Sequence, residues 1–399
     1  MFLSVIRPLD ISPHIQIPGS AAVTLALSPG GAMLLANLLP PPRCPLASRT
    51  RCQAPARHHQ PAASSSRGLL LRGAGSPVVK RLPAGDWLLW YHSDTRISLA
   101  TSPDGLRWSA PVAPDPLLPS ADWWVFDTAA VRPGDVLVIS GPDAPASSRR
   151  PPPSSSSAVY WLYYTGSNDA RLASSPFPAA DVAALPGLAI SQDGRHWARI
   201  EGAHHTGALL GVGEDHPQGW EKRCAAAPKV VMHADGDLRM YYHSFDEMSQ
   251  RHAVGVARSR DGIRWERVGK VLEGGGPGSF DEGGVRQGHV VRDRAAGRYM
   301  MAYEGLDGNG GVSIGLAVSE DGLRGWRRCS ESPALRPSED DDEWDVAGVG
   351  APCLVQMDGP YDWRLYYMGV GKDGEAAIGM AYSEGQGLPR FNKCDALLM

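Results

Sequence analysis

One short motif recurs in this chain and restricts the folds that are open to it. A serine, an Asp-Gly pair and a tryptophan appear in SPDGLRW at 102–108, SQDGRHW at 191–197, SRDGIRW at 259–265 and SEDGLRGW at 319–326. Asp-Gly between two strands is typical of a tight hairpin, because the turn needs a positive φ that glycine and aspartate tolerate. We expect the motif to be structural, since a catalytic group does not need four near-identical copies.

An aromatic stretch that ends in tyrosine accompanies the motif. Its copies are WLLWYHS (87–93), YWLYYTG (160–166), LRMYYHS (238–244), RYMMAYEG (298–305) and WRLYYMG (363–369). Once the inserts in the two longest intervals are discounted, the last tyrosines recur about every sixty residues, which indicates a repeat architecture. A run of small residues such as HAVGVARS follows each copy, and the fifth copy lacks only the Asp-Gly and tryptophan end.

Each copy contains four strand-like runs that are short, rich in β-branched and aromatic residues, and separated by Gly, Asp and Pro. Four antiparallel strands repeated at a fixed period predict an all-β fold, a β-propeller with five blades. We expect this propeller over residues 73–393, with a disordered loop at 141–158 where the sequence is GPDAPASSRRPPPSSSSA.

The first part of the chain has a different composition. Asp10 is the only acidic residue up to position 85, whereas arginines are spread among Ser, Ala and Pro. This composition is typical of an organelle transit peptide. We expect residues 1–72 to be a transit-peptide-like or disordered segment and the protein to be chloroplastic, with mitochondrion or cytoplasm as alternatives. The apolar run at 21–39 is interrupted by Ser, Pro and Gly, which argues against a membrane span.

Composition also argues against several classes of partner. The formal net charge of -4 gives no overall attraction to nucleic acid or anionic membranes. The cysteines form no CxxC and no Cys/His cluster with metal spacing, and no Gly-rich phosphate loop is followed by lysine. We expect no metal, no cofactor, no nucleic acid, no membrane partner and a monomer.

Carboxylates that follow an aromatic residue precede four of the expected inner strands: Asp127, Glu221, Asp281 and Asp345. Inner strands of a propeller begin on one face, so these acids could ring a single funnel. Neighbouring carboxylates shift one another's pKa, and glycoside cleavage needs one protonated and one ionised carboxyl group. The alternative is that each acid ties its blade to backbone amides, repeated for the same structural reason as the Asp-Gly turn.

Further polar and aromatic side chains near the same strands are candidates for substrate binding: Trp124, Arg223, His243, Arg286, Glu304 and Trp344. Arg223 and Arg286 follow acids of their own copies, where they would either form salt bridges or hold an anionic sugar. His243 and Glu304 come directly after the tyrosines of the third and fourth copies, where loops reach the mouth of a propeller.

The five-copy pattern of Pro-Val-Val, Asp-Gly, Leu-Tyr-Tyr-x-Gly and Ile-Gly-Leu-Ala-x-Ser-x-Asp-Gly-x-x-Trp resembles the arabinanase/levansucrase/invertase-type propellers. Glycosyl hydrolase families 43 and 32 share this five-bladed fold. The likeness covers about residues 73–393, and the chain looks like a plant or algal member.

The resemblance implies an aspartate in the first blade as base or nucleophile, an aspartate in the second that tunes pKa, and a glutamate in the third as general acid. Carried over by blade, Asp127 is the tuning residue and Glu221 the acid. The chain departs from the pattern around GSPVVK at 75–80, which has no carboxylate, and at Ala226, where the family places its glutamate. Asp281 and Asp345 are the candidates for the missing acid.

These observations predict a glycoside hydrolase or transglycosylase that acts on a plant-type oligo- or polysaccharide. Its catalytic residues would be drawn from Asp127, Glu221, Asp281 and Asp345. Because the first-blade acid is missing, a non-catalytic propeller that binds carbohydrate or protein remains the alternative.

Overall fold

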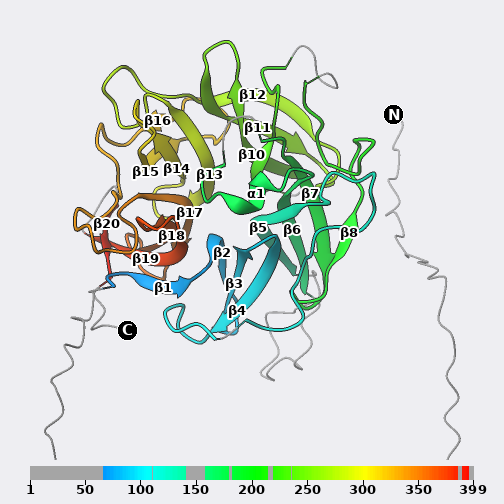
Figure 1. Ribbon diagram of the computed structural model, residues 1–399, viewed down its shortest axis with the longest axis horizontal. Helices are drawn as coiled ribbons and strands as arrows, with labels where there is room; N and C mark the ends of the chain where they lie inside the picture. Colours follow the sequence, from blue (N-terminus) through cyan, green and yellow to red (C-terminus); the bar gives the residue numbers. More distant parts are fainter. Residues whose placement is uncertain are drawn as a thin grey trace, which may run out of the picture. The chain divides into compact units, whose positions relative to one another are not determined.

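Antiparallel β-strands form five blades around a central axis, so the fold is the predicted five-bladed β-propeller, in which the first blade has three regular strands and the last has five (Figure 1). The computed structural model describes residues 66–109, 111–140, 158–178, 182–213, 219–234, 236–384 and 389–394. The transit-peptide prediction for 1–72 therefore lies almost wholly outside the described residues, as does the loop prediction for 141–158. No helix in the described part of the chain is long and apolar enough to cross a membrane.

Consecutive strands build each blade, with the innermost strand first. Blade 1 contains β2 (Gly75–Arg81), β3 (Trp87–Ser93) and β4 (Arg96–Ser102), and Ser109 and Val112 extend it by irregular hydrogen bonds to β4. The strands of blade 2 are β5 (Ala130–Ser140), β6 (Ala158–Ser167), β7 (Leu185–Ser191) and β8 (Ala198–Ile200). Blade 3 is formed by β9 (Ala226–Ala234), β10 (Asp237–Asp246), β11 (Arg251–Ser259) and β12 (Glu266–Leu272). Blade 4 comprises β13 (Gly284–Asp293), β14 (Arg298–Leu306), β15 (Val312–Ser319) and β16 (Arg327–Arg328). In blade 5 the strands are β17 (Gly348–Gln356), β18 (Trp363–Val370), β19 (Ala376–Glu384) and β20 (Arg390–Lys393).

The inner strands β2, β5, β9, β13 and β17 line the axis, and each contacts the next until β17 meets β2 again. Near its start every inner strand has a bulge, where its register with the second strand shifts. Residues with positive φ, rare outside glycine, occupy four of these bulges: Ser76, Ala227, Gln287 and Ala351. Strained backbone at equivalent places around the axis suggests that this end of the ring is functional. We call it the axial mouth.

The Asp-Gly motif forms the predicted turn in all four copies. In the first copy, Ser102 Oγ accepts hydrogen bonds from the backbone amides of Asp104 and Gly105. Asp104 Oδ1 accepts hydrogen bonds from the backbone amides of Leu106 and Arg107. Gly105 has a φ of 74°, which a side chain would disfavour. The turns at Gly194, Gly262 and Gly322 repeat this arrangement.

The turn glycines also fasten neighbouring blades together. Each glycine carbonyl accepts a hydrogen bond from an aromatic side chain on the second strand of the preceding blade. The pairs are Trp90 with Gly194 (3.0 Å), Tyr163 with Gly262 (3.1 Å), Tyr241 with Gly322 (2.6 Å) and Tyr366 with Gly105 (2.9 Å). Blade 5 lacks the motif, and blade 4 carries Ala302 at the donor position. The repeat is therefore a device that joins blades.

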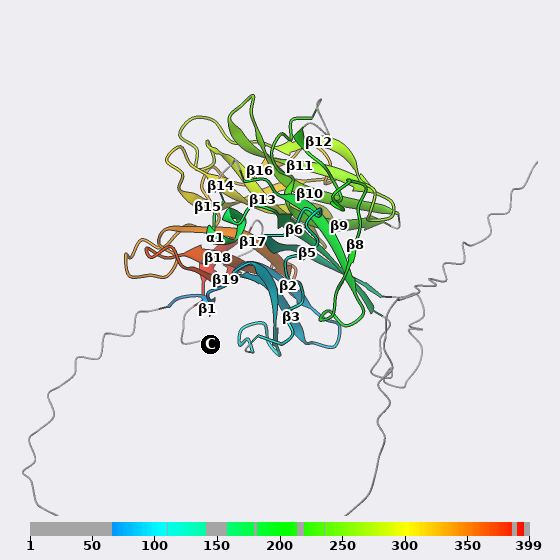
Figure 2. The same cartoon turned by 45° about the vertical axis from the view of Figure 1, so that its right-hand side comes forward.

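Both ends of the described chain complete blade 5. The strand β1 (Leu69–Arg72) pairs with residues 377–379 of β19, and β20 pairs with residues 381–384 of the same strand. The two strands thus share the outer edge of the blade, and both views place β1 beside β19 (Figures 1 and 2). The propeller begins at Leu69, inside the segment that the sequence analysis assigned to the N-terminal extension.

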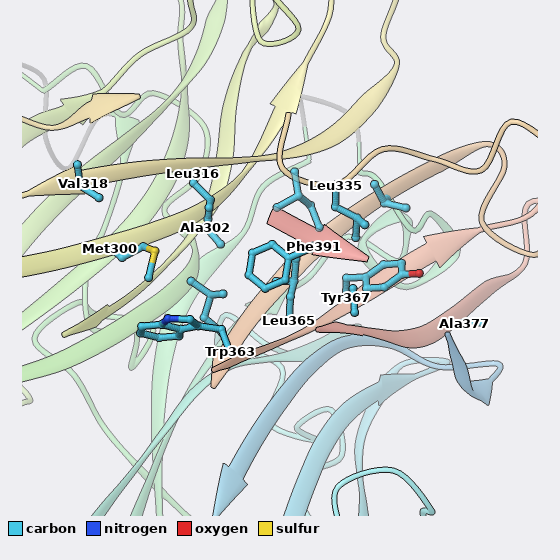
Figure 3. Packing of buried hydrophobic residues seen from close by; sticks show 14 of the residues in the cluster. Met300, Ala302, Leu316, Val318, Leu335, Trp363, Leu365, Tyr367, Ala377 and Phe391 are labelled. Carbon is cyan, nitrogen blue, oxygen red and sulfur yellow. The ribbon is translucent and has the colours of Figure 1, made fainter. Parts of the chain in front are cut away.

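Apolar side chains fill the spaces between blades. Between blades 4 and 5, Met300 and Leu316 pack toward Trp363, Leu365 and Phe391 (Figure 3). Trp363 and Leu365 are at most 1% exposed. Burial of a side chain of this size contributes about 1.5–3 kcal/mol, so the interfaces between blades hold the ring together.

Candidate functional site

The four carboxylates expected in the funnel are at most 1% exposed, and each is bonded inside its own blade. Each accepts a hydrogen bond from the last tyrosine of the aromatic stretch and pairs with a cation from the outermost strand. The sets are Asp127 with Tyr164 and Arg199, Glu221 with Tyr242 and Arg267, Asp281 with Tyr303 and Arg328, and Asp345 with Tyr367 and Lys393.

The aromatic residue before each acid stacks on the same tyrosine. Ring centroids are 5.8 Å apart for Phe126 and Tyr164, 6.4 Å for Trp220 and Tyr242, 6.2 Å for Phe280 and Tyr303, and 5.5 Å for Trp344 and Tyr367. The rings cover a glycine on the third strand, where a Cβ would clash with them. On Gly315, for example, a Cβ would lie 2.5 Å from Tyr303 Cζ.

This repeated set of acid, tyrosine, cation, aromatic ring and glycine favours the structural alternative for the four acids. Because the cation comes from the outermost strand, each carboxylate is held within its blade. Burial, followed by the neighbouring carboxylate, raises the pKa of Tyr164 and of Tyr303, so both hydroxyls stay protonated donors. A substrate could reach such an acid only if the blade opened.

The axial mouth instead gathers side chains from several blades around Glu304. Glu304 Oε2 lies 3.1 Å from Arg286 Nε, and Oε1 accepts hydrogen bonds of 2.7 Å from Gln287 Nε2 and from the amide of Ala351. Glu304 is on β14, the arginine and glutamine are on β13, and Ala351 is on β17. The carboxylate therefore joins blades 4 and 5 at the axis.

A second arginine, Arg132 of β5, occupies the same register in blade 2 as Arg286 does in blade 4. Burial lowers the pKa of Arg132 to about 10, while Glu304 opposes the shift and Arg286 adds to it. Arg132 and Arg286 are only 6% and 5% exposed, yet Arg132 Nε and Arg286 Nη2 have no hydrogen-bond partner. Glu304 thus bonds Arg286 and acts on Arg132 through its charge alone, and both guanidinium groups retain an unused donor.

Three histidines surround the arginines. Burial, with Arg132 nearby, lowers the pKa of His92, and burial with nearby Arg286 lowers that of His252 to about 3. The pKa of His243 is lowered by burial and then by His252 and Arg286. These rings are neutral at pH 7, and His92 Nε2, His243 Nδ1 and His252 Nδ1 lack partners. Unpaired polar atoms beside two cations suit a hydroxylated ligand that carries an anionic group.

The structure brings together three of the six residues proposed for substrate binding, namely His243, Arg286 and Glu304. The other three lie elsewhere: Trp124 is 42% exposed, Arg223 pairs with Glu247 at the surface, and Trp344 stacks on Tyr367. Arg132, His92, His252 and Gln287 were missed.

A signal for the missed residues exists in the departures from the repeat. The residue after the last tyrosine is histidine in two blades and differs in the other three: His92, Thr165, His243, Glu304 and Met368. At the second position before the strand-opening Pro or Gly, the chain has arginine in two blades and Gly or Ala in three: Gly75, Arg132, Ala226, Arg286 and Gly350.

A cavity of about 210 Å³ lies beside Arg132, with His92, Asp94 and Glu375 in its wall. Its remaining wall includes Ala173, Ser174 and Pro176, from and just after α1 (Arg171–Ser174), which lies over the middle of the ring in Figure 1. At the opposite end of the axis, a cavity of about 990 Å³ is lined by all five inner strands. The described residues contain no group of three or more His, Cys, Asp or Glu side chains placed to hold a metal ion.

The fold is that of five-bladed propellers found among glycoside hydrolases. A thermostable family-43 glycoside hydrolase aligns with a TM-score of 0.57 and 16% identity, over 81% of this chain and 94% of that one. A solved protein described as a glycoside hydrolase aligns with a TM-score of 0.59 and 17% identity, over 81% and 92%. An N-acetylgalactosamine deacetylase from F. plautii also aligns, with a TM-score of 0.51, 17% identity and coverage of 82% and 94%.

Two of the proteins that are similar in sequence illustrate the range of the likeness. The uncharacterized protein Rv1502 of Mycobacterium tuberculosis (strain ATCC 25618 / H37Rv) is 29% identical over 231 residues, which are 56% of this chain and 67% of that protein. A 1,2-beta-oligomannan phosphorylase of Thermoanaerobacter sp. (strain X514) is 27% identical over 182 residues, 45% of this chain and 51% of the phosphorylase. No model of a known protein family matches the chain.

Proposed function

We propose that the protein cleaves a glycosidic bond at the axial mouth and uses inorganic phosphate as the second substrate, as a glycoside phosphorylase does. One observation carries the proposal. Arg132 and Arg286 are buried at the mouth with N–H groups that have no partner; Glu304 pairs with Arg286 and acts on Arg132 only through its charge. Buried donors of this kind are costly unless a ligand satisfies them.

The balance of charge favours phosphorolysis over hydrolysis. A hydrolase of this general type needs two carboxyl groups, about 5–9.5 Å apart, to activate water or attack the sugar. Among the described residues at the mouth, Glu304 is the buried carboxylate, and it is already bonded to Arg286, Gln287 and Ala351. Guanidinium groups bind phosphate oxygens in pairs, so the two buried arginines fit a phosphate nucleophile, while Asp94 and Glu375 are exposed side chains in the cavity wall.

In the proposed reaction, an oxygen of hydrogen phosphate attacks the anomeric carbon while the bond from that carbon to the leaving oxygen breaks. The products are a sugar 1-phosphate and an alcohol, and in net terms the proton of hydrogen phosphate ends on the alcohol. Arg132 and Arg286 hold the phosphate and stabilise its charge. The neutral rings of His92, His243 and His252 hydrogen-bond sugar hydroxyls.

Two similarities support the proposal. The solved propellers described as glycoside hydrolases support chemistry at a glycosidic bond. The oligomannan phosphorylase, 27% identical over 182 residues, supports phosphate as the acceptor and a β-linked mannan fragment as the first substrate to try. A plant-type oligosaccharide is the second, from the resemblance stated above.

The test is a product assay on the full chain. Oligomannans, arabino-oligosaccharides and fructo-oligosaccharides are incubated with and without inorganic phosphate, and sugar 1-phosphate and free sugar are quantified separately. We expect sugar 1-phosphate only when phosphate is present. Arg286→Gln and Arg132→Gln should lower kcat/KM by about 10²–10³, the range observed when one charge-stabilising donor is lost. Arg286→Lys keeps the positive charge, so it should lose less activity than Arg286→Gln; equal losses in the two variants would point to general misfolding.

Arg258→Gln is the matched control, because Arg258 is an exposed arginine that pairs with Asp237 on the outer part of blade 3. It should leave activity unchanged. Release of free sugar without phosphate would replace the proposal with hydrolysis. Binding of oligosaccharide without either product would make the protein a carbohydrate-binding propeller.

A further inference from the structure

A short segment of blade 2, residues 171–178, lies across the axial mouth and is held there by the same two arginines. Arg132 donates to the carbonyl of Ser175 and, at 3.3 Å, to that of Pro176. Arg286 Nη1 donates to the carbonyl of Pro178 at 3.2 Å. We call this segment the mouth cap.

Phe177 anchors the mouth cap. The Arg286 guanidinium carbon lies 5.8 Å from the centroid of the Phe177 ring. On the other side the ring rests on β17, where Gly348 and Gly350 leave room for it. A Cβ on these glycines would lie 2.9 Å and 2.8 Å from Phe177 ring carbons. The two glycines of β17 therefore form a shallow depression in blade 5 that accommodates the Phe177 ring.

Different contacts hold the two halves of the mouth cap in place: α1 packs through the buried side chain of Leu172 against Ala130 and Val182, whereas residues 175–178 depend on fewer side-chain contacts. The amides of Leu172, Ala173 and Ser174 donate to the carbonyls of Asp169 and Ala170, within the turn of α1. Among the described residues, no backbone hydrogen bond joins 175–178 to a strand. What fixes 175–178 is the set of arginine contacts together with Phe177. Small sets of side-chain contacts permit local opening while the rest of the fold stays intact.

We propose that the mouth cap is an autoinhibitory contact: the carbonyls of 175–178 occupy the donors of Arg132 and Arg286, and an oxyanion ligand must displace them. This inference rests on the proposed function, because it takes both arginines to be ligand-binding groups. A phosphate oxygen brings a full opposite charge to the guanidinium group and can bind it with two parallel hydrogen bonds, whereas a backbone carbonyl offers one neutral oxygen. Phosphate therefore displaces the cap carbonyls from the two arginines, and Phe177 leaves β17 as the cap opens.

An autoinhibitory cap and a loop that only stabilises the fold predict different phosphate affinities for a variant that lacks Phe177. If part of the binding energy of phosphate is used to open the cap, removal of Phe177 should tighten binding, because the apparent Kd rises as the competent fraction falls. We expect Phe177→Ala to bind inorganic phosphate about fivefold more tightly than the wild type, by that same relation. Met248→Ala, which removes a side chain that is 94% exposed, is the control and should not change the Kd.

The experiment combines calorimetry with hydrogen exchange on the full chain, using inorganic phosphate as the probe. In the wild type, phosphate should speed exchange of the Leu172, Ala173 and Ser174 amides, the hydrogen-bonded amides of the cap, by about tenfold, as expected when a locally closed segment opens. Arg286→Gln should show fast exchange without phosphate.

Phosphate binding with no faster exchange, or with weaker binding to Phe177→Ala, would overturn the cap and leave the proposed function standing. Failure of phosphate to bind both the wild type and Phe177→Ala would overturn the two proposals together. If inorganic phosphate bound Phe177→Ala but not the wild type, the cap would be supported, because the closed cap would then exclude phosphate completely.

Discussion

Arg286 Nε lies 3.1 Å from Glu304 Oε2, and the two side chains are 5% and 0% exposed. They belong to adjacent strands of blade 4, whereas the amide of Ala351 that also bonds Glu304 belongs to blade 5. The pair therefore combines two roles, since it orients a guanidinium group at the mouth and ties two blades together.

Glu304→Gln should destabilise the protein because it leaves Arg286 buried without its counter-charge. Loss of one partner of a buried ion pair costs about 3–5 kcal/mol, and urea denaturation would measure the loss in this variant. Inorganic phosphate should restore part of this loss and should stabilise the variant more than the wild type. Glu247→Gln, which removes a surface pair with Arg223 in which both side chains are 46% exposed, should cost less than about 1 kcal/mol. Equal losses in the two variants would contradict the buried role of Glu304.

Asp281→Asn should lower stability without abolishing activity. Asp281 Oδ2 lies 3.0 Å from the Tyr303 hydroxyl and 2.7 Å from Arg328 Nε, and a hydrogen bond to a charged group contributes about 1.5–3 kcal/mol. A double-mutant cycle with Tyr303→Phe should reveal coupling between the two side chains. Loss of activity by orders of magnitude at unchanged stability would instead support a catalytic Asp281.

Gly315→Ala should destabilise blade 4 because a Cβ there would lie 2.5 Å from Tyr303 Cζ and 2.7 Å from Phe280 Cζ. Overpacking of this kind costs about 1–3 kcal/mol, and thermal denaturation would measure it. A Cβ on Gly276 would meet no atom within 4 Å, so Gly276→Ala is the matched control and should be close to neutral. If both substitutions were neutral, the ring stack would not be close-packed.

His289 should contribute to acid sensitivity. Burial lowers its pKa to about 3 in the folded protein, with Asp135 opposing the shift and Lys229 and Lys80 adding to it. An unfolded histidine has a pKa of about 6.5, so the unfolded chain binds the proton first and stability is lost as the pH falls from 6.5 toward 3. Between pH 7 and pH 5 the loss is about 2 kcal/mol for this residue.

His289→Asn tests this contribution. In the wild type His289 Nδ1 accepts a hydrogen bond of 3.1 Å from the backbone N–H of Leu354, and the side-chain oxygen of asparagine can accept the same bond. Denaturation at several pH values should show a flatter pH dependence for the variant. His205→Asn, at an exposed histidine, should follow the wild type. An unchanged slope in His289→Asn would show that other groups cause the acid loss.

The sequence predicted most of the fold because the fold is made of repeats. The tyrosine stretches and Asp-Gly turns recur, and each copy forms the same strands, as Gly105 and Gly262 illustrate. The closing strand at Leu69 could not be predicted, since it belongs to no copy and pairs with β19 near the other end of the chain.

The candidate site was only partly predictable, for the opposite reason. Asp127, Glu221, Asp281 and Asp345 attracted attention because they recur, yet recurrence here accompanies a repeated packing arrangement inside the blades. Arg132 has a counterpart only in Arg286, and Phe177 lies in a connection that belongs to no copy. Phe177 meets Arg286 and β17 only because the ring brings blades 2, 4 and 5 to one axis.

The shared outer edge of blade 5 has a consequence for synthesis on the ribosome. Blades 1 to 4 can form in the order in which their strands emerge, because each uses consecutive residues. The strand at 69–72 must wait for residues 377–379, almost the whole length of the chain later. Until then β1 and the open side of blade 1 have no partner, and such unpaired strand edges are exposed to pairing with another nascent chain.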